Sequence, residues 1–254
     1  MYAEYRAAGM PCATCVPGVE FGEEAALTFH AVMLCADGEG FVWVTDRLVA
    51  IPNGYATVEK ISYLKEYGVV CSVWGDQVAM HARDKLFDQL ASGSVPLSDG
   101  NEMRVFLREL GEKTLKQHRA ELTIPRGVVL AALRRQEKPH LYSLGIGWPP
   151  VALDIVDQAM LGDESNQALF FPHRYYQLSR KSIPELLAIG IHTVRLAAEM
   201  NTKGIRGVDA WVYERHELHQ LTAEEIAPYI AKSESLDIAT LESFRGAEVS
   251  EKGS

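Results

Sequence analysis

The chain has 254 residues, a formal net charge of −9 at pH 7, 47% hydrophobic residues and 23% charged residues. This composition is typical of a soluble globular protein, and no window approaches the ~18 uninterrupted apolar residues that a membrane-spanning helix needs. The acidic balance leaves no basic surface to neutralise phosphates, which argues against nucleic acid as a partner. A chain of this length can bury a large core, so we expect one globular domain.

An extended N-terminal arm is predicted for residues 1–27, because glycine and proline recur there without an apolar period. Cys12 and Cys15 have the spacing of a redox or zinc motif, but zinc usually needs four ligands and no second Cys or His pair stands at matching spacing. Residues 1–27 lack the sustained apolar run of a secretory signal, so a signal peptide is not expected. Four cysteines give no disulfide framework at this length, so a reducing, cytoplasmic location is expected.

Two β-hairpins in succession are predicted directly after the arm. In each, two apolar strand-like runs flank a turn rich in glycine and acidic residues. The predicted strands cover residues 29–36, 41–45, 58–64 and 69–74. Thr28 and Asp46 stand next to strand ends and Lys60 lies in the third predicted strand, so a single site could collect one hydroxyl, one carboxylate and one amine.

Three amphipathic helices are predicted from apolar residues at helical spacing. The first follows Asp76, a plausible N-cap, and the second runs from Met103 to about Arg119. The third, Ser182–Met200, has the clearest pattern and opens with a capping box that contains proline in the first turn. The first two helices carry more apolar side chains than one sheet face needs, which predicts assembly with other subunits through Phe87, Leu90, Phe106 and Leu110.

The second half of the chain adds a third hairpin and two further strands. The hairpin joins Gly127–Leu133 to His140–Gly147, and the strands are Val151–Val156 and Val208–Tyr213. The order of strands and helices predicts an α+β fold with antiparallel sheets. A second capping box, Thr222–Glu225, predicts a C-terminal helix start.

Neither a metal nor a cofactor is predicted. His216-Glu217-Leu218-His219 lacks the His-Glu-x-x-His spacing of zinc enzymes and follows a strand. Gly145-Ile146-Gly147 is too short for a phosphate-binding loop and precedes Trp148-Pro149 instead of a helix.

Three segments resemble the proteasome-type (A/B) subunit family of the N-terminal-nucleophile (Ntn) hydrolase superfamily. They are Asp46-Arg47 after the first hairpin, Glu59-Lys60-Ile61, and the turn Ser72-Val73-Trp74-Gly75-Asp76 before the first helix. Matching them places Thr28 near the nucleophilic threonine of that family. The spacing from Thr28 to Lys60 agrees with the family, whereas Asp46 lies slightly further along, which a longer turn absorbs.

The resemblance covers roughly Leu27 to Tyr229 and implies a four-layer αββα sandwich. It implies a propeptide-like segment over residues 1–27, an Ntn-hydrolase-like domain over residues 28–232 and a C-terminal tail over residues 233–254. It also implies catalytic roles for Thr28, Asp46 and Lys60, with a peptide or amide as substrate and with copies of the chain or related subunits as partners.

Three departures from the family pattern oppose catalysis. Leu27 stands where self-cleaving subunits usually carry glycine. Asp163-Glu164 replaces a supporting serine, and Asn201–Gly207 retains clearly only the last glycine of an Asp-x-x-Ser-Gly-Gly motif. Two functions therefore remain open: a threonine-type peptidase or amidohydrolase processed at Thr28, and a non-catalytic, ring-forming or scaffold relative with an uncut N-terminus.

Overall fold

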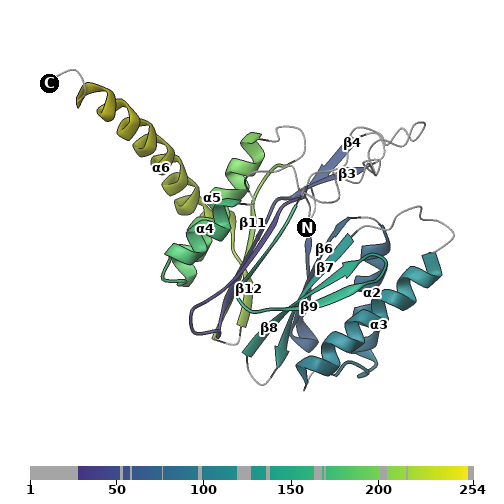
Figure 1. Cartoon of the computed structure of the whole chain (residues 1–254). Coiled ribbons are helices and arrows are strands. Elements are labelled where there is room, and N and C mark those ends of the chain that lie inside the picture. Colours follow the sequence, from purple (N-terminus) through teal and green to yellow (C-terminus); the bar gives the residue numbers. More distant parts are fainter. Residues whose placement is uncertain are drawn as a thin grey trace, which may run out of the picture.

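The computed structural model describes residues 28–51, 54–57, 59–75, 77–96, 99–118, 127–135, 138–162, 168, 170–200, 205–215 and 217–250. These residues form two five-stranded antiparallel sheets, a two-stranded ribbon and five α-helices (Figure 1). Several predicted features lie outside the described residues: the arm with Cys12 and Cys15, the Asp163-Glu164 pair, His216 and the first part of the Asn201–Gly207 segment.

The first sheet has the strand order β10-β1-β2-β11-β12, and β3 pairs with β4 in the separate ribbon. Its hairpin β1–β2 and the strand β11 confirm the sequence prediction. The strands are β1 (His30–Leu34), β2 (Phe41–Thr45), β10 (Gln158–Leu161), β11 (Asp209–Glu214) and β12 (Glu217–Gln220), with β3 (Leu48–Ile51) and β4 (Gly54–Thr57) in the ribbon.

The second sheet has the strand order β5-β6-β7-β8-β9, in which every neighbour pair is antiparallel. A 3-10 turn, Lys65–Tyr67, joins its first two strands. Both hairpins and the edge strand match the predicted strands. They are β5 (Ile61–Leu64), β6 (Val69–Gly75), β7 (Gly127–Arg135), β8 (Lys138–Ile146) and β9 (Val151–Ile155).

The helices cover the sheets separately (Figure 1). Helix α5 packs on the first sheet through Leu187, Ile191 and Val194, as its apolar stripe predicted, and α4 and α6 contribute to the same buried cluster. Helices α2 and α3 bury their apolar faces on the second sheet. The helices are α2 (Gln77–Ala91), α3 (Gly100–His118), α4 (Phe170–Leu178), α5 (Ile183–Met200) and α6 (Ala223–Ser250).

A third buried cluster joins the two sheets. Val32 and Trp43 of the first sheet pack there with Val70 and Leu141 of the second. Each sheet is therefore apolar on both faces, which explains why β1 and β2 are buried at every position. A mixed α/β fold with antiparallel sheets is confirmed.

Three short strand segments escaped the sequence prediction: β10, β12 and the β3–β4 ribbon. No strand was predicted for residues 215–220, but β12 pairs with β11 from Gln220 to Glu217. β12 is an edge strand whose side chains are mostly exposed, so backbone hydrogen bonds and not apolar alternation hold it. β10 is the other edge of the same sheet.

The prediction that α2 and α3 carry surplus apolar surface is wrong. Leu90 and Leu110 are 2% and 6% exposed, and Phe87 and Phe106 are partly buried against the same cluster. This apolar surface is buried against the second sheet and in the contact between the two helices.

The predicted tail begins inside a helix, because α6 is continuous across residues 232 and 233. None of the described helices has the length and apolarity of a membrane span.

Gly190 lets α5 approach β2 closely. A Cβ at this position would lie 2.6 Å from Cγ2 of Val44 and 3.2 Å from Cε of Met33. We expect Gly190→Ala to lower the free energy of unfolding by about 1–3 kcal/mol, despite the better helix propensity of alanine. Urea denaturation measures this loss. Adding Val44→Ala relieves the clash, so the double variant should lose less than the sum of the single losses; full additivity would contradict this packing.

Candidate active site

Thr28, Asp46 and Lys60 meet at one end of the two sheets. Thr28 precedes β1 and Asp46 follows β2, whereas Lys60 precedes β5 of the other sheet. The Lys60 amine donates to both carboxylate oxygens of Asp46, at 2.7 and 2.9 Å, and to the hydroxyl of Thr28 at 3.1 Å. The residues predicted as a site from the sequence are thus in direct contact, although their catalytic role stays a prediction.

Asp46 is fully buried and is held by the backbone as well as by Lys60. Its Oδ1 accepts from the amide of Phe29 at 2.8 Å, and its Oδ2 accepts from the amide of Leu48 at 3.1 Å. The Thr45 hydroxyl donates to the Phe29 carbonyl at 2.8 Å. Phe29 follows Thr28, so this network fixes the backbone that carries the Thr28 hydroxyl.

Lys60 uses its three ammonium donors on Asp46 and Thr28. Burial lowers the pKa of Lys60, and the attraction of Asp46 opposes this shift. Burial also raises the pKa of Asp46, against the effect of the same pair. A positive amine beside the Thr28 oxygen stabilises negative charge there, which makes the hydroxyl easier to deprotonate. Thr28 itself is partly exposed.

A buried His30–Ser72 pair lies beside the site, and sequence reasoning missed it. The Ser72 hydroxyl lies 3.0 Å from Nδ1 of His30, and both residues are fully buried. Burial lowers the pKa of His30 to about 3, and the charge of Lys60 adds to this shift. The imidazole is therefore neutral at physiological pH. The available sequence signal was the strand period of two, which would place His30 on the same side of the chain as Thr28 if the strand extended back to Thr28.

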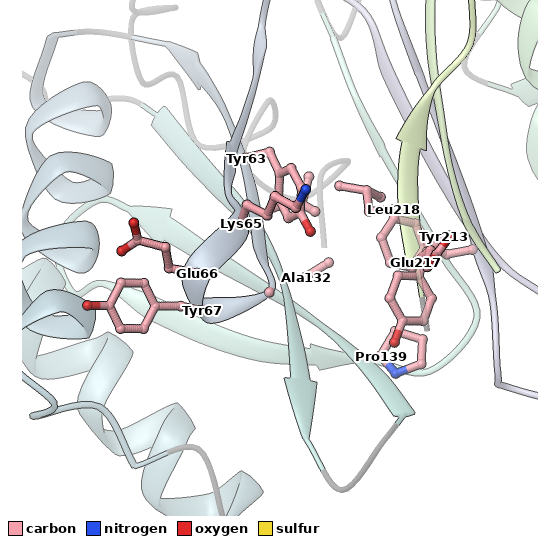
Figure 2. Close-up of a pocket in the computed structure, with 12 residues that line it drawn as sticks. Tyr63, Lys65, Glu66, Tyr67, Ala132, Pro139, Tyr213, Glu217 and Leu218 are labelled. Atoms are coloured by element: carbon pink, nitrogen blue, oxygen red, sulfur yellow. The ribbon is translucent and has the colours of Figure 1, made fainter. Parts of the chain in front are cut away.

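A pocket with a volume of about 470 Å³ is at the other end of the sheets. Figure 2 shows Tyr63 and Lys65 on one side of it and Tyr213 and Leu218 on the other. Strand β2 begins at Phe41 in this pocket and ends at Thr45 beside the Thr28 site. The pocket is consequently separate from the predicted catalytic residues.

No three His, Cys, Asp or Glu side chains are grouped for metal binding in the part of the chain that the structure describes. The only carboxylate in contact with Lys60 and the Thr28 backbone region is that of Asp46, among the described residues. It already accepts hydrogen bonds from Lys60 and from two backbone amides. The Thr28 hydroxyl thus lies beside a fixed positive charge.

No family model and no curated protein matches the chain. Solved structures do match it across most of their length. Anbu (ancestral beta-subunit) from Yersinia bercovieri has a TM-score of 0.67 at 10% identity, covering 85% of this chain and 96% of that chain. The helical assembly of the Anbu complex from Pseudomonas aeruginosa gives a TM-score of 0.67 at 12% identity, covering 85% of this chain and 95% of that chain. At these identities the likeness shows the fold.

These matches correct the assignment to the proteasome-type (A/B) subunit family. Four of the matching solved structures are Anbu proteins, and one of them is named as an ancestral beta-subunit. The motifs around Asp46, Lys60 and Gly75 describe an ion pair at strand ends and a turn into a helix. Such features belong to the fold, so they do not distinguish one family that has the fold from another.

The neutral, buried state of His30 predicts a dependence of stability on pH. The pKa of His30 is about 3 in the folded protein and 6.5 as the ordinary value. Between these pH values the unfolded chain binds a proton that the folded chain does not. The free energy of unfolding should therefore fall with decreasing pH by up to about 1.4 kcal/mol per pH unit from this group alone.

Urea denaturation between pH 7 and pH 4 tests this dependence, with His30→Leu/Ser72→Ala as the comparison. The double variant removes the titrating group together with its partner, so its stability should fall less steeply with decreasing pH. Equal slopes for the two proteins would contradict the buried neutral state of His30.

Proposed function

We propose that this chain is a proteasome-like N-terminal-nucleophile hydrolase that cleaves peptide or amide bonds through Thr28. The observation that carries the proposal is the contact of the Lys60 amine with both the Thr28 hydroxyl, at 3.1 Å, and the Asp46 carboxylate, at 2.7 Å. The Anbu fold supports it, since Anbu structures are named as ancestral beta-subunits.

The mechanism requires cleavage of the chain before Thr28. The new α-amine, with an ordinary pKa of about 8, takes the hydroxyl proton as general base, and no histidine is needed. The Thr28 oxygen attacks the substrate carbonyl, the C–N bond breaks, and the leaving amine takes the proton held by the α-amine. The resulting acyl-enzyme ester is then hydrolysed by water, which releases the acid and restores the Thr28 hydroxyl. Lys60 stabilises negative charge on the oxygen, and Asp46 orients Lys60 through charge-assisted hydrogen bonds.

The alternative is a non-catalytic relative that keeps residues 1–27 attached. Leu27 before Thr28 favours this function, because glycine eases the strained turn through which self-cleavage passes. The Asp46–Lys60 pair also has a structural role, since removing either partner would leave a buried charge alone.

The same proposal includes the arrangement of the sheets and helices in four layers. Helices on the outer face of each sheet, with the sheets packed together, support a four-layer αββα sandwich. Assembly of several copies is supported by the Pseudomonas aeruginosa Anbu, whose solved structure is a helical assembly. Free thiols at Cys35 and Cys71 suit a cytoplasmic location.

The N-terminus of the purified protein tests the proposed function. We expect mass spectrometry to find a chain that begins at Thr28 and hydrolyses peptide amide substrates. Thr28→Ala should abolish hydrolysis, because no hydroxyl remains to attack, while Thr28→Ser should retain part of the activity. The thermal midpoint of Thr28→Ala should stay within a few degrees of wild type, since Thr28 lies outside the buried core.

An intact chain from Met1 without hydrolytic activity would favour the non-catalytic alternative. Activity that survives Thr28→Ala would place the nucleophile elsewhere.

The proposed assembly predicts the mass of the particle in solution. Size exclusion with light scattering should give a multiple of the 28.2 kDa chain mass at micromolar concentration. A strictly monomeric species would contradict stable self-assembly.

A further inference from the structure

We propose that His30 and Ser72 form a cross-sheet link that positions Thr28 on Lys60. This inference rests on the proposed function, because it assigns two positioning residues to the Thr28 site. Neither residue touches the reacting oxygen in the structure.

The need for such a link follows from the origin of the site residues. Thr28 leads into β1 of the first sheet, whereas Lys60 leads into β5 of the second. The 3.1 Å contact between them therefore depends on the spacing between the two sheets. A small change in that spacing would separate the hydroxyl from the amine.

The His30–Ser72 contact bridges the same two sheets next to this point. His30 is the first residue of β1 and the second residue after Thr28. Ser72 of β6 is the register partner of Ile61, the residue directly after Lys60. Two polar contacts therefore join the two sheets side by side. Thr28 contacts Lys60, and their near neighbours His30 and Ser72 contact each other at 3.0 Å.

The His30–Ser72 contact fixes the position of β1 relative to β6 and does not transfer a proton. Both residues are fully buried, so water does not compete for the contact. The His30 ring engages the Ser72 hydroxyl and the Val73 backbone, both from β6. An imidazole held in this way anchors β1 to β6 and has no role as a base for Thr28.

Three variants of the full chain test the link. His30→Leu/Ser72→Ala removes both partners and leaves neither side chain unsatisfied, so it should fold. Ser72→Ala is a milder second variant, and His30→Asn retains a polar group near the position of Nδ1. The matched control is His192→Leu/Ser233→Ala, which removes another buried histidine–serine contact, of 2.7 Å, between α5 and α6.

Two measurements are made on each variant. The first is the rate at which a β-lactone acylates Thr28, located by peptide mass mapping. The second is the side-chain pKa of Lys60, followed by NMR with labelled lysine, which requires no reaction.

Loss of the link should slow acylation by about 10- to 100-fold, because a displacement near 1 Å has effects of this size. Water that reaches Lys60 should raise its pKa toward the ordinary value. Ser72→Ala should shift both measurements in the same direction, His30→Asn should recover most of the acylation rate, and the control should behave as wild type.

Wild-type acylation and an unchanged Lys60 pKa in both His30→Leu/Ser72→Ala and Ser72→Ala would overturn the link. An equal effect in the control variant would also overturn it, since the effect would then be one of general stability. If wild type is not acylated at Thr28, the proposed function fails, and the pKa of Lys60 alone decides whether the link positions it.

Discussion

The buried ion pair between Asp46 and Lys60 is the contact on which the rest of the site depends. Removing a carboxylate and an amine from water is costly, and the pair offsets this cost only when geometry and further hydrogen bonds are good. Asp46 meets that condition with two lysine contacts and two backbone amides. The same bonds fix the backbone at Phe29, so the electrostatic requirement of one pair determines where the neighbouring hydroxyl of Thr28 lies.

The pair also joins two sheets that pack on each other mainly through apolar side chains. Val32, Trp43, Val70 and Leu141 provide a contact that tolerates small sliding movements, because dispersion and the hydrophobic effect have little directionality. Hydrogen bonds between side chains of opposite sheets do not tolerate such movements. Polar contacts at the Thr28 end therefore give this part of the interface a defined geometry that apolar packing alone does not supply.

Much of the fold followed from the sequence, because long elements have strong periodicity. The stripe of α5 and the hairpin β1–β2 needed only local patterns. Thr28 and Asp46 stood at the ends of one predicted hairpin and Lys60 near the start of the next predicted strand, so their convergence was also predictable. The contact of His30 with Ser72 was not, because alternation shows which residues share a face but not which faces of two sheets meet. The edge strands β10 and β12 were missed since their pairing is a backbone property.

The sheet order has a consequence for the way the protein folds during synthesis. The site residues lie close together in sequence, but the strands that flank their hairpin come much later: β10 pairs with β1, and β11 pairs with β2. Until the second half of the chain emerges, a largely apolar hairpin has two open edges. Such edges recruit other strands, and closing them depends on slow, non-local contacts. The nascent chain therefore passes through an aggregation-prone stage, and a chaperone that covers this hairpin would increase the yield of folded protein.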